Sequence, residues 1–445
     1  MMCEEEVHIG IDDVDSWNGG CTTHFAFLLL HEIKKRFEFR LLDYPNLVRL
    51  NPNIPWKTRG NGAVCLRLSI KEKMYEQLLE LLKSMVKWYC ESYYDCDPGI
   101  AVARRIDPDL HKLSRRALFS VVTLREALEE AEKLGVEVIK IRAGMGLIGA
   151  LASIGSLLEG DYTYEALTYR VRRGVERAVD PESVWLMEFT TWPLTFNNVD
   201  PESGRVLITP RGPDPVLCGV RGEEPSIVLR ATKMIRIMED VAGCVVYRTN
   251  QGTDAHYYEL DRLDLIEPYL SVALQGEVSS KPMVIKGGHV VFKVSIGRGE
   301  IWCAAYKPSG EVREVAERLI EGDVVKVYGG VRRLPTTGEL SINLEKLAVV
   351  RATRDVGEKN PPCPMCHKTL KSSGRGGLKC LRCGFKVKGK LKIKVEQDRS
   401  IIEGFYLPPP RSMRHLAKPL RRYGLEKQGY YKVEEGKVEL KEVLL

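Results

Sequence analysis

Apolar and polar positions alternate through the first 120 residues in a way that indicates an α/β domain. We predict a strand over 6–12, a helix over 22–37, extended segments near 39–50 and 62–70, and a helix over 71–88. Within the last helix, apolar residues recur at a helical spacing: Met74, Leu78, Leu79, Leu81, Leu82, Met85 and Val86. Helices interleaved with strands predict a sheet covered by helices.

The second block, residues 121–265, mixes the two patterns differently. We predict a helix over 123–134, a strand Val136–Ile141, a glycine-rich turn at 144–146, an apolar helix from Leu147, and strands near 184–191, 226–232 and 243–249. This order suggests an α+β domain of the ferredoxin-like type.

From about 268 to 355 the chain changes to short strands. They cover Val272–Val278, His289–Ile296, Glu300–Ala305, Val324–Val331 and Leu340–Val350, with one helix, Val312–Ile320, between the third and fourth. Five strands with a helix in that place are typical of an OB-fold barrel. Such barrels mostly bind single-stranded nucleic acid or oligosaccharide, and a purely structural barrel is the alternative.

Four cysteines lie in two Cys-x₂-Cys pairs, Cys363/Cys366 and Cys380/Cys383, with thirteen residues between the pairs. Each pair can hold one side of a tetrahedral ion, and thiolate is a preferred ligand of Zn²⁺. All four ligands come from the protein, so we predict a structural zinc ribbon within residues 356–445. The remaining eight cysteines are scattered, which favours reduced thiols over a disulfide framework.

Charge is unevenly distributed along the 445 residues. The net charge is +7, yet residues 356–445 alone carry 21 Lys and Arg against nine Asp and Glu. Aromatic residues at 405, 406 and 423 flank a stretch without acids that supplies the candidate RNA-binding cations Arg411, Arg414, Lys418, Arg421 and Arg422. Cations mixed with aromatics suit single-stranded or looped RNA, and a merely solvated basic tail is the alternative.

The chain has no apolar run of membrane-spanning length, and its N-terminus is acidic. A signal peptide begins with basic residues, so we expect no membrane association and a cytoplasmic location.

Acidic residues cluster where the first predicted strand ends. Asp12, Asp13 and Asp15 are followed by a Gly19-Gly20 turn and then by Thr22 and Thr23, which open the next helix. Helix N-termini favour bound anions, and Mg²⁺ bridges carboxylates to phosphate oxygens. We therefore predict a metal-assisted phosphate site, and an acidic turn with a Thr cap is the alternative.

Other loops could complete such a site. Lys57 and Arg59 offer cations, Gly60 and Gly62 allow close backbone approach, and Trp56 offers a face for stacking. The glycine-rich turn at 144–149 could cradle a phosphate or pack tightly. Three polar loops each carry a carboxylate, and they either turn the chain or surround a cationic substrate: Asp200, Asp214 and Asp254.

Taken together, these motifs resemble the archaeal tRNA(Ile) agmatidine synthetase (2-agmatinylcytidine synthetase) family. The resemblance rests on Gly-Ile-Asp-Asp-x-Asp-Ser, Cys-Thr-Thr-His, Pro-Trp-Lys-Thr-Arg-Gly-Asn-Gly-Ala, Gly-Leu-Ile-Gly-Ala-Leu-Ala, Gly-Pro-Asp-Pro-Val-Leu and Asn-Gln-Gly-Thr-Asp-Ala-His. It implies an N-terminal ATP-dependent kinase-like domain over 1–120, a ferredoxin-like domain over 121–265, an OB-fold over 268–355, and a zinc ribbon with a basic tail over 356–445.

The resemblance also implies a reaction. In this family the 2-oxo group of the wobble cytidine in a CAU anticodon is phosphorylated by ATP, and agmatine then displaces phosphate while ATP ends as AMP. The modified base pairs with A, so the tRNA decodes AUA. ATP, Mg²⁺ and structural Zn²⁺ are the implied cofactors, and tRNA(Ile) and agmatine the partners. A nucleic-acid kinase that stops at phosphoryl transfer and a non-catalytic RNA-binding protein are the alternatives.

Residue roles follow from the same resemblance. Asp12, Asp13 and Asp15 would hold Mg²⁺, and Thr22 matches the family's autophosphorylated threonine. ATP phosphates would lie near Gly19, Gly20, Thr22, Thr23, Lys57, Arg59, Gly60 and Gly62. Our own inference places agmatine at Asp200, Asp214 and Asp254, since a guanidinium favours paired carboxylate contacts. The chain departs from the family at Val14, where Thr is usual, and at Met145, where Arg is more frequent.

Overall fold

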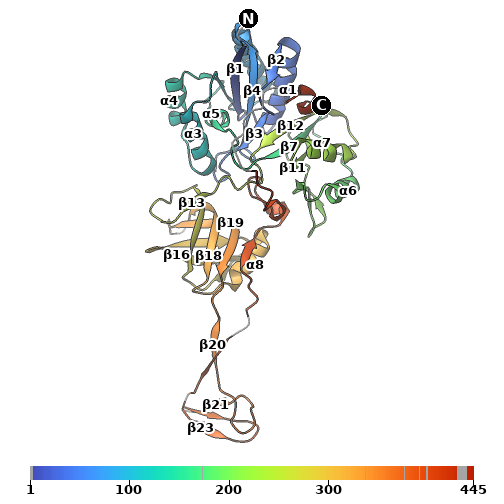
Figure 1. The fold of residues 1–445 in the computed structure, drawn as a ribbon. Coiled ribbons are helices and arrows are strands. Elements are labelled where there is room, and N and C mark those ends of the chain that lie inside the picture. Colours follow the sequence, from blue (N-terminus) through green and yellow to red (C-terminus); the bar gives the residue numbers. More distant parts are fainter. Residues whose placement is uncertain are drawn as a thin grey trace.

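One mixed sheet forms the core of the α/β body, which occupies the upper part of Figure 1. The computed structural model describes residues 4–444 except 173, 336, 375, 390, 397, 398 and 428–437. The strand order is β6-β5-β1-β4-β3-β12-β7-β11-β8, and β2 pairs with β4. The bounds are β1 Glu4–Asp12, β2 Phe39–Leu41, β3 Asn46–Arg49, β4 Gly62–Lys71, β5 Gly99–Ala103, β6 Glu137–Lys140, β7 Thr163–Arg170, β8 Thr195–Phe196, β11 Val216–Gly222 and β12 Val241–Thr249.

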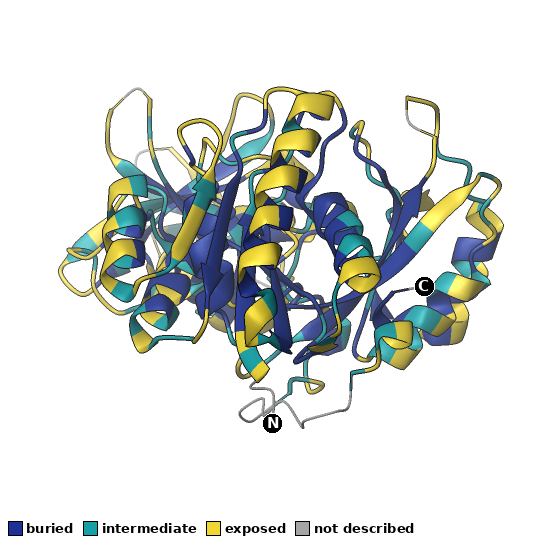
Figure 2. Ribbon diagram, turned by 90° about the horizontal axis from the view of Figure 1, so that it is seen from above, coloured by how far each residue is buried: buried dark blue, intermediate teal, exposed yellow. Residues whose placement is uncertain are grey.

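Helices cover the first half of this sheet on both sides, with their exposed faces outward (Figure 2). They are α1 Thr22–Arg36, α2 Tyr75–Tyr93, α3 Pro108–Phe119, α4 Leu124–Leu134 and α5 Leu147–Gly155, with a short 3₁₀ turn at Glu72–Met74. The predicted helices over 22–37 and 123–134 are confirmed nearly to the residue. At 123–134 the reason is local, because Thr123 and Glu126 form a reciprocal capping box and Gly135 ends the helix in the left-handed region.

The second half has the ferredoxin-like connectivity β7-α6-β8-β11-α7-β12 with spatial order β12-β7-β11-β8. The ferredoxin-like prediction is therefore confirmed, but two of its predicted strands are wrong. Residues near 184–191 and 226–232 belong to helices α6 Pro181–Thr191 and α7 Pro225–Met234. Each of these helices begins with proline at its first position, directly after an acidic residue, and this start signal outweighs the β-branched and aromatic content.

The two halves share the sheet because β3 and β12 pair in parallel, with Arg248 opposite Asn46 and Thr249 opposite Leu47. In addition, β6 extends the sheet next to β5, and α5 packs on β1. Residues beyond 120 thus complete the first half of the body. The division at 120/121 stays a prediction, and so does the kinase-like character of the N-terminal part.

A β-barrel lies below the body in Figure 1. Its strands are β14 Ser271–Val278, β16 His289–Ile296, β17 Gly299–Ala305, β18 Val324–Arg333 and β19 Leu340–Arg351, and helix α8 Glu311–Arg318 lies between β17 and β18. This is the predicted OB-fold order. Short strands extend the sheet: β13 Tyr258–Leu260, β15 Met283–Ile285 and β25 Gly404–Tyr406.

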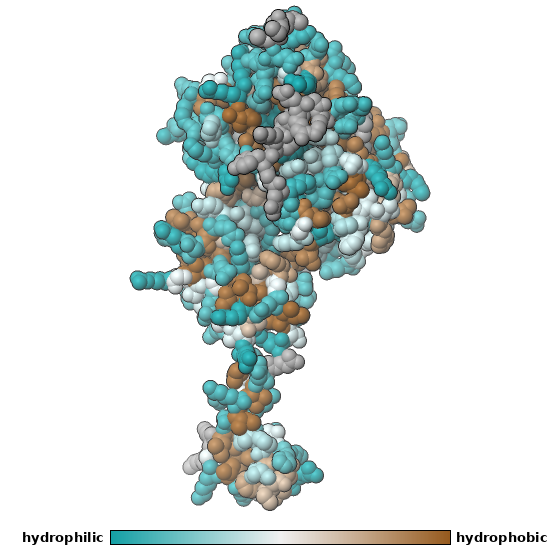
Figure 3. Space-filling model, in the orientation of Figure 1, coloured by the Kyte–Doolittle hydropathy of each residue, from teal (hydrophilic) through white to brown (hydrophobic). Residues whose placement is uncertain are grey.

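A small module stands apart at the far end of the molecule, joined to the barrel by the narrow neck visible in Figure 3. The neck contains the antiparallel pair β20 Val356–Lys359 and β24 Ile393–Glu396. The module holds β21 Lys371–Ser373, β22 Gly377–Lys379 and β23 Lys386–Lys388.

After this module the chain returns to the body. Arg399 pairs with buried Asp323 of the barrel at 2.6 and 2.7 Å, and β25 then pairs with β19. Residues 404–427, which we call the C-terminal strap, run on to the body with 3₁₀ turns at Pro410–Ser412 and Leu420–Arg422. At the end of the chain, α9 Leu440–Val443 buries Val443 in the core, and Leu444 bridges to Val245. In the described part of the chain no helix is long and apolar enough to cross a membrane.

Candidate active site

Three carboxylates gather at the end of β1, as the sequence predicts. Asp12 ends the strand, and Asp13 turns the chain with a positive φ of 55°. Burial and the neighbouring carboxylate of Asp13 raise the pKa of Asp12 well above its usual value, and burial together with Asp15 raises the pKa of Asp13 to about 6. Burial also raises the pKa of Asp15, although Arg59 opposes this. Acids crowded in this way would be stabilised by a cation.

Thr22 is the first residue of α1 and lies against this acidic turn. Its hydroxyl donates a hydrogen bond to Asp15 Oδ2 at 2.9 Å and accepts one from the backbone N–H of Val14 at 3.3 Å. Thr22 and Thr23 are both buried at the helix N-terminus. The contact orients the Thr22 oxygen and gives it a carboxylate that can accept its proton.

Two cavities meet at the loop between β3 and β4, and both are lined by Thr58 and Asn61. The larger, of about 490 Å³, holds Asp15, Thr22, Thr23, Arg59, Gly60 and Gly62. The smaller, of about 230 Å³, holds Asp12, Asp13, Trp56 and Lys57 together with apolar side chains: Leu50, Ile54, Val122, Met145 and Ile148. The acidic turn therefore separates a highly charged cavity from one with an apolar wall that suits a flat ring.

Arg59 connects the two halves of the body. Its guanidinium lies 3.2 Å from Asp15 and 3.6 Å from Asp214, and it donates to the backbone oxygen of Ser16 at 2.9 Å. Of the three acids proposed for a cationic substrate, only Asp214 lines this cavity. Asp200 accepts from Arg411 and Ser203, while Asp254 pairs with Lys346 and with the backbone N–H of Lys418.

The glycine-rich turn at 144–149 packs tightly and does not line the larger cavity. A Cβ at Gly149 would come within 1.8 Å of Asp12 Oδ2, and one at Gly146 within 2.5 Å of the Asp12 backbone oxygen. Asp97 holds the turn from the other side by accepting from the backbone N–H of Gly144 at 2.6 Å. These glycines thus let α5 approach the acidic turn. Met145, where the resemblance leads us to expect arginine, lines the small cavity, and Lys57 is the cation among the described residues that line it.

Several cavity residues were not predicted from sequence. Arg221 and Glu165 face each other on adjacent strands and pair at 3.0 Å, and Arg49 lies 3.9 Å from Glu165. Arg49 Nε has no hydrogen-bond partner among the described residues. No local motif marks these residues, because they meet only through the pairing of strands far apart in sequence.

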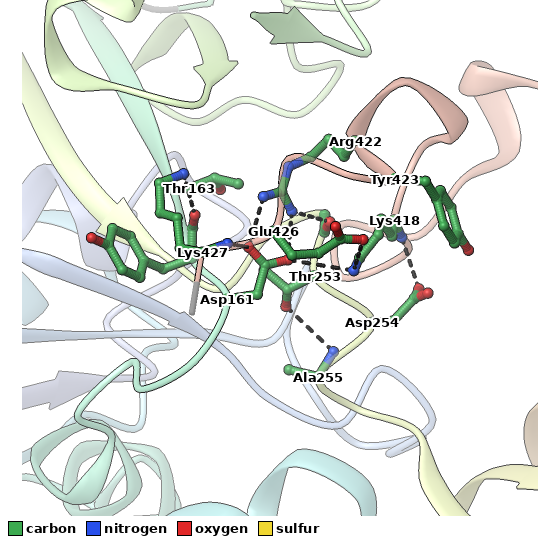
Figure 4. A network of polar contacts seen from close by, with 12 residues as sticks. Asp161, Thr163, Thr253, Asp254, Ala255, Lys418, Arg422, Tyr423, Glu426 and Lys427 are labelled. Carbon is green, nitrogen blue, oxygen red and sulfur yellow. Dashed lines mark hydrogen bonds and ion pairs between the residues drawn. The ribbon is translucent and has the colours of Figure 1, made fainter. Parts of the chain in front are cut away.

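The C-terminal strap corrects the interpretation of the basic tail. Arg422 is fully buried and donates to Glu223 at 2.5 and 3.1 Å. It also donates to Asp161 at 2.8 and 3.0 Å (Figure 4). Lys418 pairs with Glu426 at 3.0 Å. Arg421 pairs with Glu188, and Arg411 with Asp200, both at 2.6 Å. An enclosed, doubly paired guanidinium cannot reach RNA, so Arg422 anchors the strap to the body. Arg414 is the most open of the five, with 47% of its side chain exposed.

The four predicted zinc ligands come together in the far module. The Sγ atoms of Cys363, Cys366, Cys380 and Cys383 all lie within 4.8 Å of one another, with separations of 3.5 Å for Cys363–Cys383 and 3.4 Å for Cys366–Cys380. Zn–S bonds of about 2.3 Å in a tetrahedron require S–S separations of about 3.8 Å. The donor set and its spacing therefore fit a closed structural Zn²⁺ site.

These features define a class of protein: a multidomain chain in which an α/β body with an acid- and cation-lined site is joined to an OB-fold and a zinc ribbon. Family models match all four parts, as the TiaS TCKD domain over 8–73, the TiaS FLD domain over 144–256, an OB-fold nucleic acid binding domain over 272–350 and the TiaS C-terminal zinc ribbon domain over 360–401.

Relatives match over nearly the whole length. The tRNA(Ile) 2-agmatinylcytidine synthetases TiaS of Ignisphaera aggregans and Pyrococcus horikoshii are 40% and 41% identical to the chain, and the matches cover 94% and 93% of it and 94% and 96% of those proteins. A crystal structure of a complex of TiaS with its isoleucine tRNA and ATP matches with a TM-score of 0.85 and 35% identity, covering 94% of this chain and 97% of that one. A complex of TiaS with the same tRNA, AMPCPP and agmatine matches with a TM-score of 0.81 and 33% identity, covering the same shares. The chain belongs to the tRNA(Ile) 2-agmatinylcytidine synthetase (TiaS) family.

Proposed function

We propose that this chain uses ATP to attach agmatine to the wobble cytidine of tRNA(Ile). The observation that carries the proposal is the match over nearly the full length to relatives of that name, including structures with the isoleucine tRNA, ATP and agmatine. The site is chemically suited to the task, because a cavity rich in cations adjoins one with an apolar wall. A triphosphate suits the first cavity and a base suits the second.

Mg²⁺ is the metal we propose for Asp12, Asp13 and Asp15. The donor set fits, because hard carboxylate oxygens are the ligands that Mg²⁺ takes together with phosphate oxygens. When bound, the ion would neutralise negative charge on the phosphates. Arg59 and Arg49 would add cationic contacts to the same phosphates, and the Nε of Arg49, which has no partner among the described residues, supplies a donor for an anion.

Thr22 is our candidate for the phosphate-accepting hydroxyl. Its hydrogen bond to Asp15 directs a lone pair away from that carboxylate, and the N-terminus of α1 favours the negative charge of a transferred phosphoryl group. In the overall reaction we propose, the cytidine 2-oxo oxygen takes a phosphoryl group, the primary amine of agmatine attacks C2, and phosphate leaves with that oxygen. AMP would be the nucleotide product, because the γ-phosphoryl group goes to the cytidine oxygen and the β-phosphoryl group goes to water, so that two phosphates are released in all.

For agmatine we retain Asp214, because it lines the large cavity. Asp200 and Asp254 do not line it, and their carboxylates pair with the strap and the barrel, so we no longer propose them as ligands. Asp15 and Asp214 together hold the guanidinium of Arg59, so this pair of acids already accepts a planar group of the same chemistry.

Mass spectrometry of nucleosides tests the proposal. An unmodified tRNA(Ile) transcript with a CAU anticodon is incubated with the protein, ATP, Mg²⁺ and agmatine. We expect a cytidine that gains the mass of agmatine less water, only when ATP is present. ATP consumption with a phosphorylated RNA and no adduct would instead support the kinase alternative.

The Thr22→Ala variant tests the role of the hydroxyl. Incubation with γ-labelled ATP should label the wild-type protein and leave the variant unlabelled, because the acceptor oxygen is gone. Thr190→Ala, which removes an exposed hydroxyl on α6, is the control and should label normally. Labelling of Thr22→Ala at the wild-type level would assign the acceptor to another residue.

A further inference from the structure

An exposed strip of aromatic and cationic side chains crosses the junction between the body and the barrel, next to the small cavity. Trp56 is 57% exposed and meets the ring of Tyr269 edge-on, with centroids 5.6 Å apart. The guanidinium carbon of Arg332, at the end of β18, lies 5.1 Å from the Tyr269 ring. Tyr306, which follows β17, is 41% exposed, and its hydroxyl donates at 3.2 Å to Asn343 of β19, the strand paired with the end of β18 that carries Arg332. We call Trp56, Tyr269, Arg332 and Tyr306 the junction strip.

The junction strip is held rigidly between the two domains. Asn51 donates to the backbone oxygen of Tyr269 at 2.8 Å, and Asn53 donates to Ser271 Oγ at the same distance. Arg332 donates to the backbone oxygen of Asn53 at 2.5 Å. Asn51 and Asn53 are fully enclosed, and a Cβ at Gly330 would meet the Asn53 side chain at 2.1 Å. The loop that carries Trp56 therefore keeps a fixed position relative to the barrel.

Cations from three parts of the chain lie at this loop. Lys57 belongs to the loop itself, and Arg332 comes from the barrel. Arg414 comes from the C-terminal strap and lines the large cavity together with Thr58 of the loop. Burial lowers the pKa of Lys57, and Arg414 and Arg332 lower it further, so the three charges lie close enough to repel one another. Arg414 has Glu345 at 3.8 Å, yet nearly half of its side chain stays exposed. Neighbouring cations that repel one another favour a bound anion between them.

We propose that the junction strip binds the single-stranded nucleotides adjacent to the target cytidine, with bases on Trp56 and Tyr306 and the intervening phosphates on Lys57, Arg332 and Arg414. This inference rests on the proposed function, which supplies a looped RNA as substrate. Base stacking on aromatic rings combined with phosphate contacts is the usual basis of single-strand binding. Trp56 and Lys57 also line the small cavity beside Asp12 and Asp13, so the strip leads directly to the acidic turn.

Binding of an RNA hairpin tests the proposal. The probe is a fluorescent anticodon stem-loop with a seven-nucleotide loop containing CAU, titrated with the full-length protein at several KCl concentrations. Trp56→Ala should weaken binding about 10-fold with an unchanged salt slope, because a stacking surface is lost without a charge. Arg332→Gln should also weaken binding and reduce the slope of log K against log salt by about 0.7, as expected for one lost phosphate contact.

Matched variants control for general damage. Trp88→Ala removes a tryptophan of α2 that is 52% exposed, and Arg298→Gln removes an exposed cation at the turn between β16 and β17, the end of the hairpin away from Tyr306. Both should bind the hairpin like the wild type. Unchanged hairpin affinity in Trp56→Ala would overturn the proposal. So would a raised KM for ATP without a loss of RNA affinity, since Trp56 would then belong to the nucleotide site.

Photo-crosslinking gives a readout that does not depend on how well a variant folds. A hairpin with 5-iodouridine in place of the loop uridines should crosslink to the peptide that contains Trp56 or Tyr306 in the wild-type protein, and crosslinks confined to other peptides would overturn the proposal.

Failure of the proposed function and failure of the junction-strip proposal can be told apart. If no agmatine adduct forms but the hairpin crosslinks to Trp56, only the proposed reaction fails. If the adduct forms and Trp56→Ala binds RNA normally, only the junction strip fails.

Discussion

At the scale of single residues, the site depends on how closely side chains and backbone approach Asp12. The conformation of the acidic turn is fixed by the positive φ of Asp13 and by the close approach of α5 at Gly149. Val14, where the resemblance leads us to expect threonine, is fully buried, and its backbone N–H donates to the Thr22 hydroxyl. Because valine has no hydroxyl, the hydrogen bonds between the turn and Thr22 come from the backbone N–H of Val14 and from the Asp15 carboxylate.

Replacing Gly149 by alanine should reduce activity without unfolding the protein. The added methyl group would collide with the Asp12 carboxylate, while alanine is favoured over glycine in a helix by about 1 kcal/mol. We expect kcat for ATP-dependent modification to fall at least about 10-fold, with the melting temperature within a few degrees of wild type. Ser84→Ala, an exposed position on α2 away from the site, is the control. Wild-type kcat in Gly149→Ala would show that the acidic turn tolerates a shift of Asp12.

His8 gives a prediction for pH dependence. This β1 residue is buried next to Arg67, and burial and the Arg67 charge lower its pKa from 6.5 to about 3. Because the unfolded chain binds the proton more readily, His8 should cost the folded state about 3 kcal/mol as the pH falls from 6.5 to 4. The free energy of unfolding of His8→Gln should therefore fall less steeply over this range, as measured by denaturant titration at each pH. Parallel curves for the two proteins would contradict the prediction.

At the scale of elements, the C-terminal strap behaves as part of the body. Its cations face a row of carboxylates on the ferredoxin-like half, and its backbone accepts hydrogen bonds from the N–H groups of Gly252 and Asp254. His415 from the strap lines the large cavity beside Gly60, where a Cβ would lie 3.0 Å from the His415 ring. Burial, followed by the charges of Arg49 and Arg221, lowers the pKa of His415 well below its usual value, which keeps the imidazole neutral.

Breaking the strap anchor should destabilise the body. Arg422→Ala leaves the buried carboxylate of Glu223 and the partly buried carboxylate of Asp161 without their main partner, and removing one partner of a buried pair costs about 3–5 kcal/mol. Arg399→Ala is the control. It breaks the ion pair between Arg399, which precedes the strap, and Asp323 of the barrel, and it should leave the unfolding of the body unchanged. Thermal unfolding followed by calorimetry measures both. A loss below about 1 kcal/mol in Arg422→Ala would show that Lys418 and Lys427 are sufficient to hold the strap.

At the scale of the whole molecule, the zinc ribbon is the most separate part. Only the narrow neck joins it to the barrel, whereas the chain on either side of it is built into the barrel and the body (Figure 1). A deletion of 356–445 would therefore remove the strap as well. Replacing residues 360–392 by a short flexible linker is the cleaner experiment, because it keeps the β20–β24 pair of the neck and the Arg399–Asp323 ion pair of the barrel.

This replacement, or removal of zinc with a chelator, should weaken the affinity for full-length tRNA and reduce its salt dependence, because ribbon lysines and arginines are lost. The melting transition of the body should not move, since the ribbon packs on its own small core of cysteine, leucine and aromatic side chains. Binding of the isolated anticodon hairpin is the control and should be unaffected. Unchanged tRNA affinity would show that the barrel and the body bind the tRNA without the ribbon.

Local signals predicted a large part of the architecture. The barrel strands, the capped helix at 124–134 and the zinc ligands follow from periodicity, capping residues and cysteine spacing, each of which acts over a few residues. The prediction failed for α6 and α7, where apolar residues suited both helix and strand and the proline start signals were given too little weight. It also missed β7, whose eight residues are all buried, because a central strand shows no alternation of polar and apolar positions.

The sequence by itself determined the order of the modules, the Cys₄ set and the acidic turn before α1, because these depend on neighbours along the chain. Only the tertiary structure decided how the chain parts combine. Pairing of β3 with β12 joins the two halves into one sheet, strand register brings Glu165 to Arg221, and the returning strap places Arg422 inside the body and Arg414 at the junction. These contacts connect residues tens to hundreds of positions apart, and no local pattern encodes which distant carboxylate a given arginine will meet.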